Sequence, residues 1–295
     1  MKKTTTMIII ILSFVLLGIG ITMSNPQQTA PLSPKQTENR IADENEEDTS
    51  SDAPVEESTN SEIKTPADEI SKEIEEVIQS TIEFFSDKET KVVAIGDSLT
   101  QGVGDQSEQG GYVGILDAYL NREKQVAVFE NYGKRGNRTD QLISRLQEPE
   151  IEQSIENADI VLITIGANDI MQVAKENFLD INYEVFAKER VHYEERIRKI
   201  FSSLKETNPD AAIYLIGFYN PFKQYFEHIQ ELDMIVNDWN YIGKKVAESY
   251  GETFIPTKDL FMSEEVNLFA EDHFHPNETG YQRIAERILN YLVVE

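Results

Sequence analysis

Short apolar runs alternate with amphipathic stretches from residue 92 onwards, and this alternation constrains the fold more than any other feature. The runs lie at 92–95, 126–129, 160–165, 213–216 and, more weakly, 254–255. The amphipathic stretches lie at 111–122, 138–147, 184–207, 229–250 and 277–292. Short strands that alternate with helices are typical of a parallel sheet with helices on both faces. The sequence therefore predicts an α/β fold, a three-layer α/β/α sandwich with a five-stranded parallel sheet.

One more helix is predicted ahead of the first strand. Thr65 and Pro66 supply a capping residue and a first-turn proline. Apolar side chains follow at helical spacing, at Ile70, Ile74, Val77, Ile78, Ile82 and Phe85. We therefore expect the folded domain to span residues 65–295.

The N-terminus has the features of an export signal or a membrane anchor. Lys2 and Lys3 precede an uncharged, mainly apolar run, Met7–Met23. A run of about 17 apolar residues lies between the length of a signal core and that of a full membrane span. The small-x-small cleavage patterns near its end are weak. Residues 1–24 are therefore better interpreted as a retained anchor than as a cleaved signal peptide. The lysines predict a cytoplasmic N-terminus and an exported remainder, either membrane-anchored or secreted after cleavage.

Residues 25–64 are predicted to form a disordered acidic linker. They are rich in Pro, Gln, Ser, Thr, Asn and acidic residues, with almost no aliphatic side chains that could form a core. The interpretation is a spacer that holds the folded domain away from a membrane.

Charge and cysteine content exclude several classes of partner. The chain carries a net charge of −26, of which −20 belongs to residues 64–295, so it repels phosphate backbones and no nucleic-acid partner is expected. Membrane contact is expected only through the N-terminal segment. The absence of cysteine excludes disulfides, thiolate metal sites and a lipid-modified N-terminal cysteine.

Residues that could take part in catalysis follow the predicted strands. Ser98, in the segment Gly96-Asp97-Ser98-Leu99, follows the first strand, a loop containing Gly133 and Gly136 follows the second, and Asn168 follows the third. In open parallel sheets, ligands bind at the carboxyl ends of the strands. Each motif alone also fits an ordinary turn, and Ser98 is not in a G-x-S-x-G elbow, since Thr100 occupies the last glycine position.

The segment Asp272-His273-Phe274-His275-Pro276 is more specific. The spacing lets the Asp272 carboxylate reach Nδ1 of His275, while Pro276 restricts the conformation of the histidine before it. Ester hydrolysis by a serine requires a hydroxyl nucleophile, an imidazole base, a carboxylate that orients it, and oxyanion donors. The sequence contains a candidate for each of these parts.

In combination, four segments resemble the SGNH or GDSL hydrolase family over Val92–Tyr281. These sequence blocks are the ones around Ser98, Gly136 and Asn168, and the segment from Asp272 to Pro276. The resemblance implies a flavodoxin-like sheet, with Ser98 as nucleophile, His275 as base and Asp272 as its partner. It also implies an oxyanion hole formed by the N–H groups of Ser98 and Gly136 and by the side chain of Asn168. The block around Gly136 is the loosest match.

The expected function is that of a serine carboxylic-ester hydrolase, a lipase, acylhydrolase or lysophospholipase-like enzyme that works through an acyl-enzyme without a cofactor or metal. Expected substrates are small esters, lipids or acylated sugars, and a cell-surface carbohydrate O-deacetylase of the same fold is the alternative. Two weaker alternatives are a non-catalytic binding module and a metallophosphoesterase. The latter would use a metal cluster of Asp97, Asp169, Asp272, His273 and His275.

An aromatic stretch after the fourth strand is a candidate substrate pocket. Phe218, Tyr219 and Phe222 are its proposed lining residues, with Tyr225 and Phe226 close behind in the sequence. Ordinary packing of a connecting loop explains the same pattern. An insertion, residues 171–184, is a second segment expected to shape or cover the site.

Overall fold

The computed structural model describes residues 66–85, 89–107, 109–177, 181–222, 231–262 and 265–292. The predicted signal or anchor, residues 1–24, and the predicted linker, residues 25–64, lie outside these ranges. Among the described residues, none of the helices combines the length and the apolar character needed to cross a bilayer.

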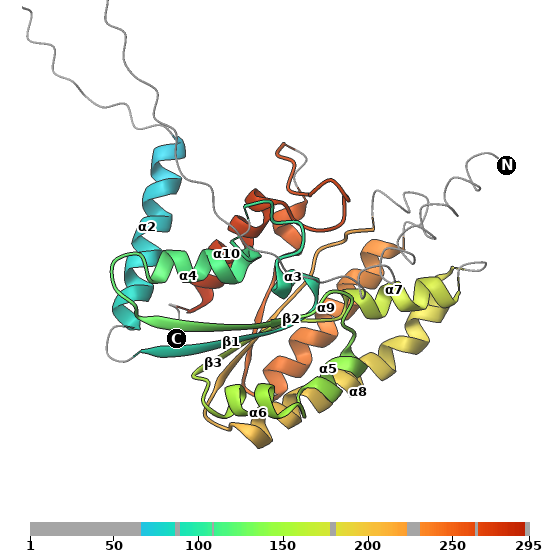
Figure 1. Cartoon of the computed structure of the whole chain (residues 1–295). Coiled ribbons are helices and arrows are strands. Elements are labelled where there is room, and N and C mark those ends of the chain that lie inside the picture. Colours follow the sequence, from blue (N-terminus) through green and yellow to red (C-terminus); the bar gives the residue numbers. More distant parts are fainter. Residues whose placement is uncertain are drawn as a thin grey trace, which may run out of the picture. The chain divides into compact units, whose positions relative to one another are not determined.

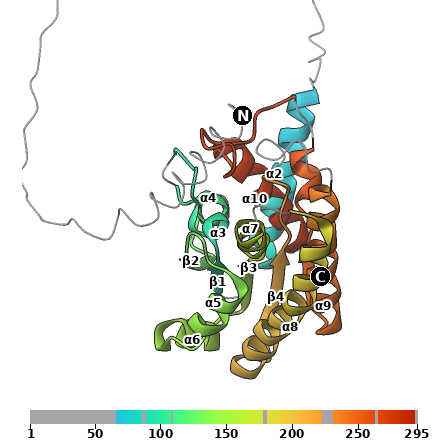
Figure 2. The same ribbon diagram turned by 90° about the vertical axis from the view of Figure 1, so that its right-hand side faces the viewer.

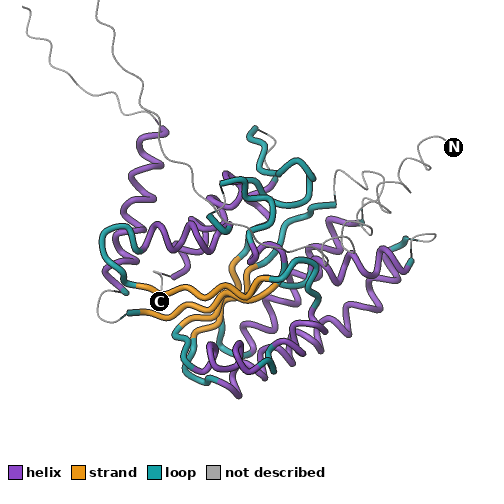
Figure 3. The backbone as a smooth tube through the Cα atoms, in the orientation of Figure 1, coloured by secondary structure: helices purple, strands orange, loops and turns teal. Residues whose placement is uncertain are grey.

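A five-stranded parallel sheet forms the centre of the fold (Figures 1 and 3). Its strands are β1 (Thr90–Gly96), β2 (Ala127–Gly133), β3 (Ile160–Thr164), β4 (Ala212–Ile216) and β5 (Thr253–Ile255). They are ordered β2-β1-β3-β4-β5, and every neighbouring pair is parallel. The prediction of an α/β fold with a five-stranded parallel sheet is confirmed.

Helices cover both faces of the sheet (Figures 1 and 2). One face carries α2 (Pro66–Phe84), α4 (Gly111–Leu120) and α10 (Glu278–Leu292), and the other carries α5 (Thr139–Arg145), α6 (Pro149–Glu156), α8 (Tyr183–Thr207) and α9 (Leu232–Ser249). Val92 and Ala94 of β1 belong to the core under α4 and α10. Because side chains alternate along a strand, Val93 and Ile95 face the opposite layer, and all four are buried. Burial on both faces explains the continuous apolar runs in the sequence.

Several elements differ from the sequence-based expectation. Strand β2 continues to Gly133, four residues beyond the predicted run, because its polar second half pairs with β1 up to Gly96. Helix α7 (Ala167–Glu176) includes the first part of the expected insertion, and α8 begins at Tyr183. The first part of the expected insertion over 171–184 is therefore helical, and a role of this segment in shaping or covering the site stays a prediction. Helix α6, also unpredicted, is short and begins with Pro149 in its first turn.

The carboxyl ends of the strands bring separate parts of the sequence to one edge of the sheet. Helix α3 (Ser98–Gln101) follows β1, a loop at 134–138 follows β2, and α7 follows β3. The first turns of α10 lie against the loop after α3, where Tyr281 Oη donates a hydrogen bond to the Val103 carbonyl (2.7 Å). This edge carries the candidate site.

Candidate active site

Ser98 lies at a sharp turn between β1 and α3. Gly96, with φ +154°, makes this turn possible, because a Cβ atom at this position would lie 2.1 Å from the Thr164 carbonyl oxygen. The Asp97 N–H donates to the same carbonyl oxygen (3.0 Å). The close approach of β1 and β3 therefore fixes the position at which Ser98 leaves the sheet.

Asp97 is a buried carboxylate beneath the serine. It accepts hydrogen bonds from the Leu99 N–H (3.0 Å) and the Thr164 hydroxyl (2.9 Å). The Thr164 hydroxyl is also 2.7 Å from that of Thr100, which lies 2.9 Å from the Tyr112 hydroxyl. Burial raises the pKa of Asp97 to about 7, although its hydrogen bonds act in the opposite direction. The sequence shows Asp97 as a turn residue and gives no sign of this buried network.

Replacing Asp97 with asparagine is expected to make stability less dependent on pH. The raised pKa means that folded Asp97 retains a proton that the unfolded chain has lost, so the contribution of Asp97 to stability falls as pH rises from about 4 to above 7. Between pH 5 and pH 8, the wild-type free energy of unfolding should fall by about 2 to 3 kcal/mol more than that of Asp97→Asn. Urea denaturation of both proteins at the two pH values measures this difference, and equal falls would contradict the assignment.

Ser98, His275 and Asp272 form a hydrogen-bonded chain. The Ser98 Oγ lies 2.9 Å from Nε2 of His275, and Nδ1 of the same ring lies 2.6 Å from Oδ2 of Asp272. The second oxygen of Asp272, Oδ1, accepts the backbone N–H groups of Phe274 (3.0 Å) and His275 (2.9 Å). The structure thus brings together a hydroxyl and an imidazole that are 177 residues apart in the sequence.

The electrostatics of Asp272 favour its ionised form. Partial burial alone would raise the pKa of this carboxyl, but the hydrogen bonds from His275 and Phe274 and the attraction of a protonated His275 outweigh it. The pKa of Asp272 is therefore held far below its usual range. An ionised Asp272 accepts a hydrogen bond from the Nδ1–H of His275, which holds the ring proton on Nδ1 and leaves Nε2 unprotonated and able to accept the proton of Ser98.

Close backbone packing holds the histidine loop against the serine turn. Gly104 has φ +96°, and a Cβ atom there would lie 2.6 Å from the Pro276 carbonyl oxygen and 2.9 Å from the Cβ of His275. The carbonyl of His275 accepts the Ala270 N–H (2.9 Å). This role of Gly104 was not predicted from the sequence. The only indication there is the presence of two glycines, Gly102 and Gly104, close together.

The predicted backbone oxyanion donor lies in the loop after β2. Gly136 is exposed and has a left-handed φ of +77°. The loop is fastened to the serine turn, because the Lys134 N–H donates to the Gly96 carbonyl (3.0 Å) and the Arg135 N–H donates to Oε1 of Gln101 (2.6 Å). The block around Gly136, the loosest match to the family, is thus hydrogen-bonded to the β1–α3 turn.

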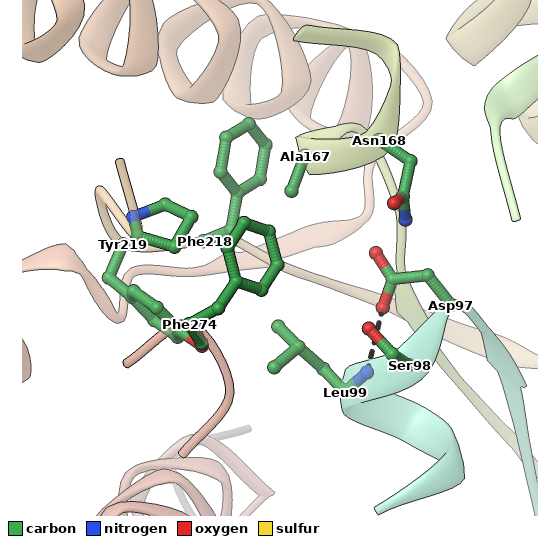
Figure 4. A pocket seen from close by; sticks show the side chains of 9 residues that line it. Asp97, Ser98, Leu99, Ala167, Asn168, Phe218, Tyr219 and Phe274 are labelled. Atoms are coloured by element: carbon green, nitrogen blue, oxygen red, sulfur yellow. Dashed lines mark hydrogen bonds between the residues drawn. The ribbon is translucent and has the colours of Figure 1, made fainter. Parts of the chain in front are cut away.

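The predicted side-chain donor, Asn168, lies in the first turn of α7. Its Nδ2 donates to the Asn137 carbonyl (3.1 Å). A side-chain amide nitrogen carries two hydrogens, so one remains for a ligand. In Figure 4 the Asn168 amide points toward the same space as the Ser98 hydroxyl.

A small pocket opens in front of Ser98 (Figure 4). It encloses about 270 Å³, including open solvent, and is lined by Asp97, Ser98, Leu99, Ala167, Asn168, Phe218, Tyr219, Pro221 and Phe274. Polar groups occupy one side and aromatic rings the other. The Tyr219 hydroxyl donates to the Phe274 carbonyl (2.8 Å), which fixes two of the rings relative to one another.

The structure corrects part of the predicted aromatic pocket. Phe218 and Tyr219 line the pocket, but Phe222 does not. It is 1% exposed and packs edge-to-face behind Phe274, with ring centroids 5.8 Å apart. Tyr225 and Phe226 lie outside the described residues.

The residues of the alternative metal cluster are not gathered around one point. Within the described ranges, no three His, Asp or Glu side chains are grouped so that they could hold a metal ion. His273 is exposed, with φ +51°. Asp169 faces Arg196, and Asp97 faces Thr164, instead of a shared centre.

Comparisons with known proteins find a matching family and several relatives. The profile of the GDSL-like Lipase/Acylhydrolase family matches residues 94–283. "Uncharacterized protein YpmR" of Bacillus subtilis is 38% identical over 202 residues, which cover 67% of this chain and 79% of that protein. "Spore germination lipase LipC" of Bacillus licheniformis is 28% identical over 203 residues, 66% of this chain and 92% of that protein. The crystal structure of the lipase Lip_vut3 from a goat rumen metagenome has a TM-score of 0.60 and 23% identity, covering 70% of this chain and 97% of that one.

Proposed function

Because this chain belongs to the GDSL-like lipase/acylhydrolase family and is a hydrolase of that family, we propose that it cleaves carboxylic esters through Ser98, His275 and Asp272. The observation that carries this proposal is the continuous chain of contacts, 2.9 Å from Ser98 to His275 and 2.6 Å from His275 to Asp272. These distances lie within hydrogen-bonding range, as proton transfer between nucleophile and base requires.

The proposed reaction has two steps. His275 accepts the Ser98 proton through Nε2 while Ser98 Oγ attacks the ester carbonyl, and the resulting tetrahedral intermediate carries a negative oxygen. Collapse of this intermediate breaks the bond to the alkoxy oxygen, which receives the proton from His275 and leaves as an alcohol. Water, activated by His275, then attacks the acyl-enzyme and releases the acid and free Ser98.

The oxyanion donors we propose come from three elements. The N–H groups of Ser98 and Gly136 and the Nδ2 of Asn168 would stabilise the negative oxygen of the intermediate. Such donors accelerate the reaction because they are already oriented when charge develops. The bonds that fasten the 134–138 loop and Asn168 to their surroundings support this role.

We propose that the acyl group lies against the aromatic side of the pocket, formed by Phe218, Tyr219 and Phe274. An apolar wall beside a polar reaction centre suits the acyl chain of a lipid ester. The similarity to a protein named as a spore germination lipase favours the same substrate class. Carbohydrate O-deacetylation is the second candidate, favoured by the narrow pocket beside Ser98, which suits a short acyl group.

The proposal is tested by covalent labelling and by an ester series. A fluorophosphonate probe should label the full-length protein once, and peptide mass analysis should place the label on Ser98. The protein should also hydrolyse p-nitrophenyl esters. A rate that rises from acetyl to octanoyl supports a lipid substrate, whereas a preference for acetyl and for acetylated sugars supports O-deacetylation. Absence of both labelling and hydrolysis would refute the serine mechanism.

A further inference from the structure

Asp169 is a buried carboxylate that the proposed reaction does not use. Its side chain is 3% exposed and lies in the first turn of α7, directly after Asn168. It accepts hydrogen bonds from the Thr139 N–H (3.1 Å), the Thr139 hydroxyl and Nη2 of Arg196 (3.2 Å). Three donors therefore surround this one carboxylate.

Each partner of Asp169 has a defined position relative to the candidate oxyanion donors. Thr139 is the first residue of α5 and follows Gly136 by three positions. The hydrogen bonds that Thr139 donates to Asp169 therefore join the end of the loop that carries Gly136 to the start of α7, which carries Asn168. The bond from Asn168 Nδ2 to the Asn137 carbonyl is a second connection between the same two segments.

Arg196 of α8 fixes the direction of the hydrogen bonds. Its Nε donates to the Thr139 hydroxyl oxygen (2.6 Å), so the proton of this hydroxyl is directed to Asp169. Its Nη2 bonds both Asp169 and Glu189 (2.7 Å). Burial raises the pKa of Asp169, and the bonds from Thr139 and the charge of Arg196 act against this rise.

We propose that Asp169, Thr139 and Arg196 are positioning residues that hold the Asn168 side chain and the Gly136 N–H at a fixed separation. This inference rests on the proposed function, because it assigns a purpose to the spacing of the two oxyanion donors. None of the three residues lines the pocket in front of Ser98. Their effect reaches the reaction through the position of Asn168 and of the 134–138 loop.

The first test is kinetic and uses Thr139→Val, which keeps the side-chain shape and the backbone N–H but removes the hydroxyl. It should lower kcat about 10- to 100-fold and leave KM within about threefold, because small displacements of catalytic groups are costly. Thr139→Ser, which keeps the hydroxyl, should recover most of the rate. Asp169→Asn should resemble Thr139→Val.

Coupling to Asn168 separates positioning from a general loss of stability. Asn168→Ala alone should lower kcat about 100- to 1,000-fold. Because the part of the Thr139 effect that acts through Asn168 is already lost in Asn168→Ala, adding Thr139→Val to that variant should lower kcat by a smaller factor than Thr139→Val lowers it in the wild type. A full multiplicative loss in the double variant would overturn the proposal.

A matched control is available at the opposite edge of the sheet. Glu252 is a 10% exposed carboxylate that, like Asp169, accepts a backbone N–H, from Ile213 (2.6 Å), and pairs with a cation, Lys205. Glu252→Gln should lower the melting temperature and leave kcat within about twofold. A fall in kcat equal to that of Asp169→Asn would assign both effects to stability and overturn the proposal.

Hydrogen exchange tests the positioning independently of any activity. Backbone amides at 134–138 should exchange faster in Thr139→Val than in Thr139→Ser or in the wild type. Unchanged exchange would overturn the positioning role even in an active enzyme. Retained activity in a Ser98 variant would instead refute the proposed function, so the two failures are distinguishable.

Discussion

Replacing Ser98 with alanine is expected to lower kcat for p-nitrophenyl acetate by about 10⁴-fold or more. The variant retains the pocket and the oxyanion donors but has no oxygen with which to form an acyl-enzyme. Removal of the nucleophile from a complete Ser-His-Asp arrangement has effects of about 10⁶ in other hydrolases, and the remaining activity comes from binding and oxyanion stabilisation. Steady-state release of p-nitrophenol, followed by its absorbance, measures the change.

A serine outside the site provides the control for this experiment. Ser202 is on α8, where its hydroxyl donates to Glu206 (2.8 Å) on the protein surface. Ser202→Ala should hydrolyse the ester at the wild-type rate. Ser98→Ala should also lose labelling by a fluorophosphonate probe while its melting temperature stays close to that of the wild type. A Ser98→Ala protein with near-normal turnover would show that another group attacks the ester.

The parts of the fold that follow from local patterns were predictable from the sequence. Strand β3 is buried along its full length, so its sequence is a continuous apolar run. The amphipathic helices show apolar residues at helical spacing. Polar stretches with weaker patterns were not predictable. The second half of β2 is polar. It extends as a strand because the backbone of β2 pairs with that of β1 over seven residue pairs.

The candidate site divides in the same way. Asp272 and His275 are three residues apart, so their contact could be expected from spacing alone. Ser98 could be proposed because it follows a strong strand signal. Contacts between distant parts of the chain could not be predicted in this way. The sequence around Gly104 does not indicate that His275 packs against it. The sequence around Thr139 does not indicate a hydrogen bond to Asp169.

Phe222 shows why composition does not identify pocket residues. Like Phe218, it is an aromatic residue that follows β4 within a few positions. The direction of each side chain is set by packing after the chain leaves the sheet. Phe222 turns into the protein against Phe274, and Phe274, from a distant loop, takes a place on the pocket wall.

Asp272→Asn is expected to lower kcat about 10³- to 10⁴-fold with little change in structure. Oδ1 of Asp272 accepts two backbone N–H groups, from Phe274 and His275. An asparagine must place its carbonyl oxygen in this position, since its amide nitrogen is only a donor. The amide nitrogen then faces Nδ1 of His275 and donates to it, so the ring carries its proton on Nε2 and no longer accepts one from Ser98. The wrong tautomer has an effect of this size in another serine hydrolase.

The two variants Asp272→Asn and Asp272→Ala separate this tautomer effect from simple loss of a carboxylate. Alanine removes the misdirected donor and leaves room for a small anion beside Nδ1, so added formate should restore part of the activity of Asp272→Ala. The filled site of Asp272→Asn should show no such rescue. Asp259→Asn, which alters an exposed pair with Arg287, is the matched carboxylate control and should keep wild-type kcat. Equal rescue of both Asp272 variants, or full activity in Asp272→Asn, would show that Asp272 does not set the tautomer of His275.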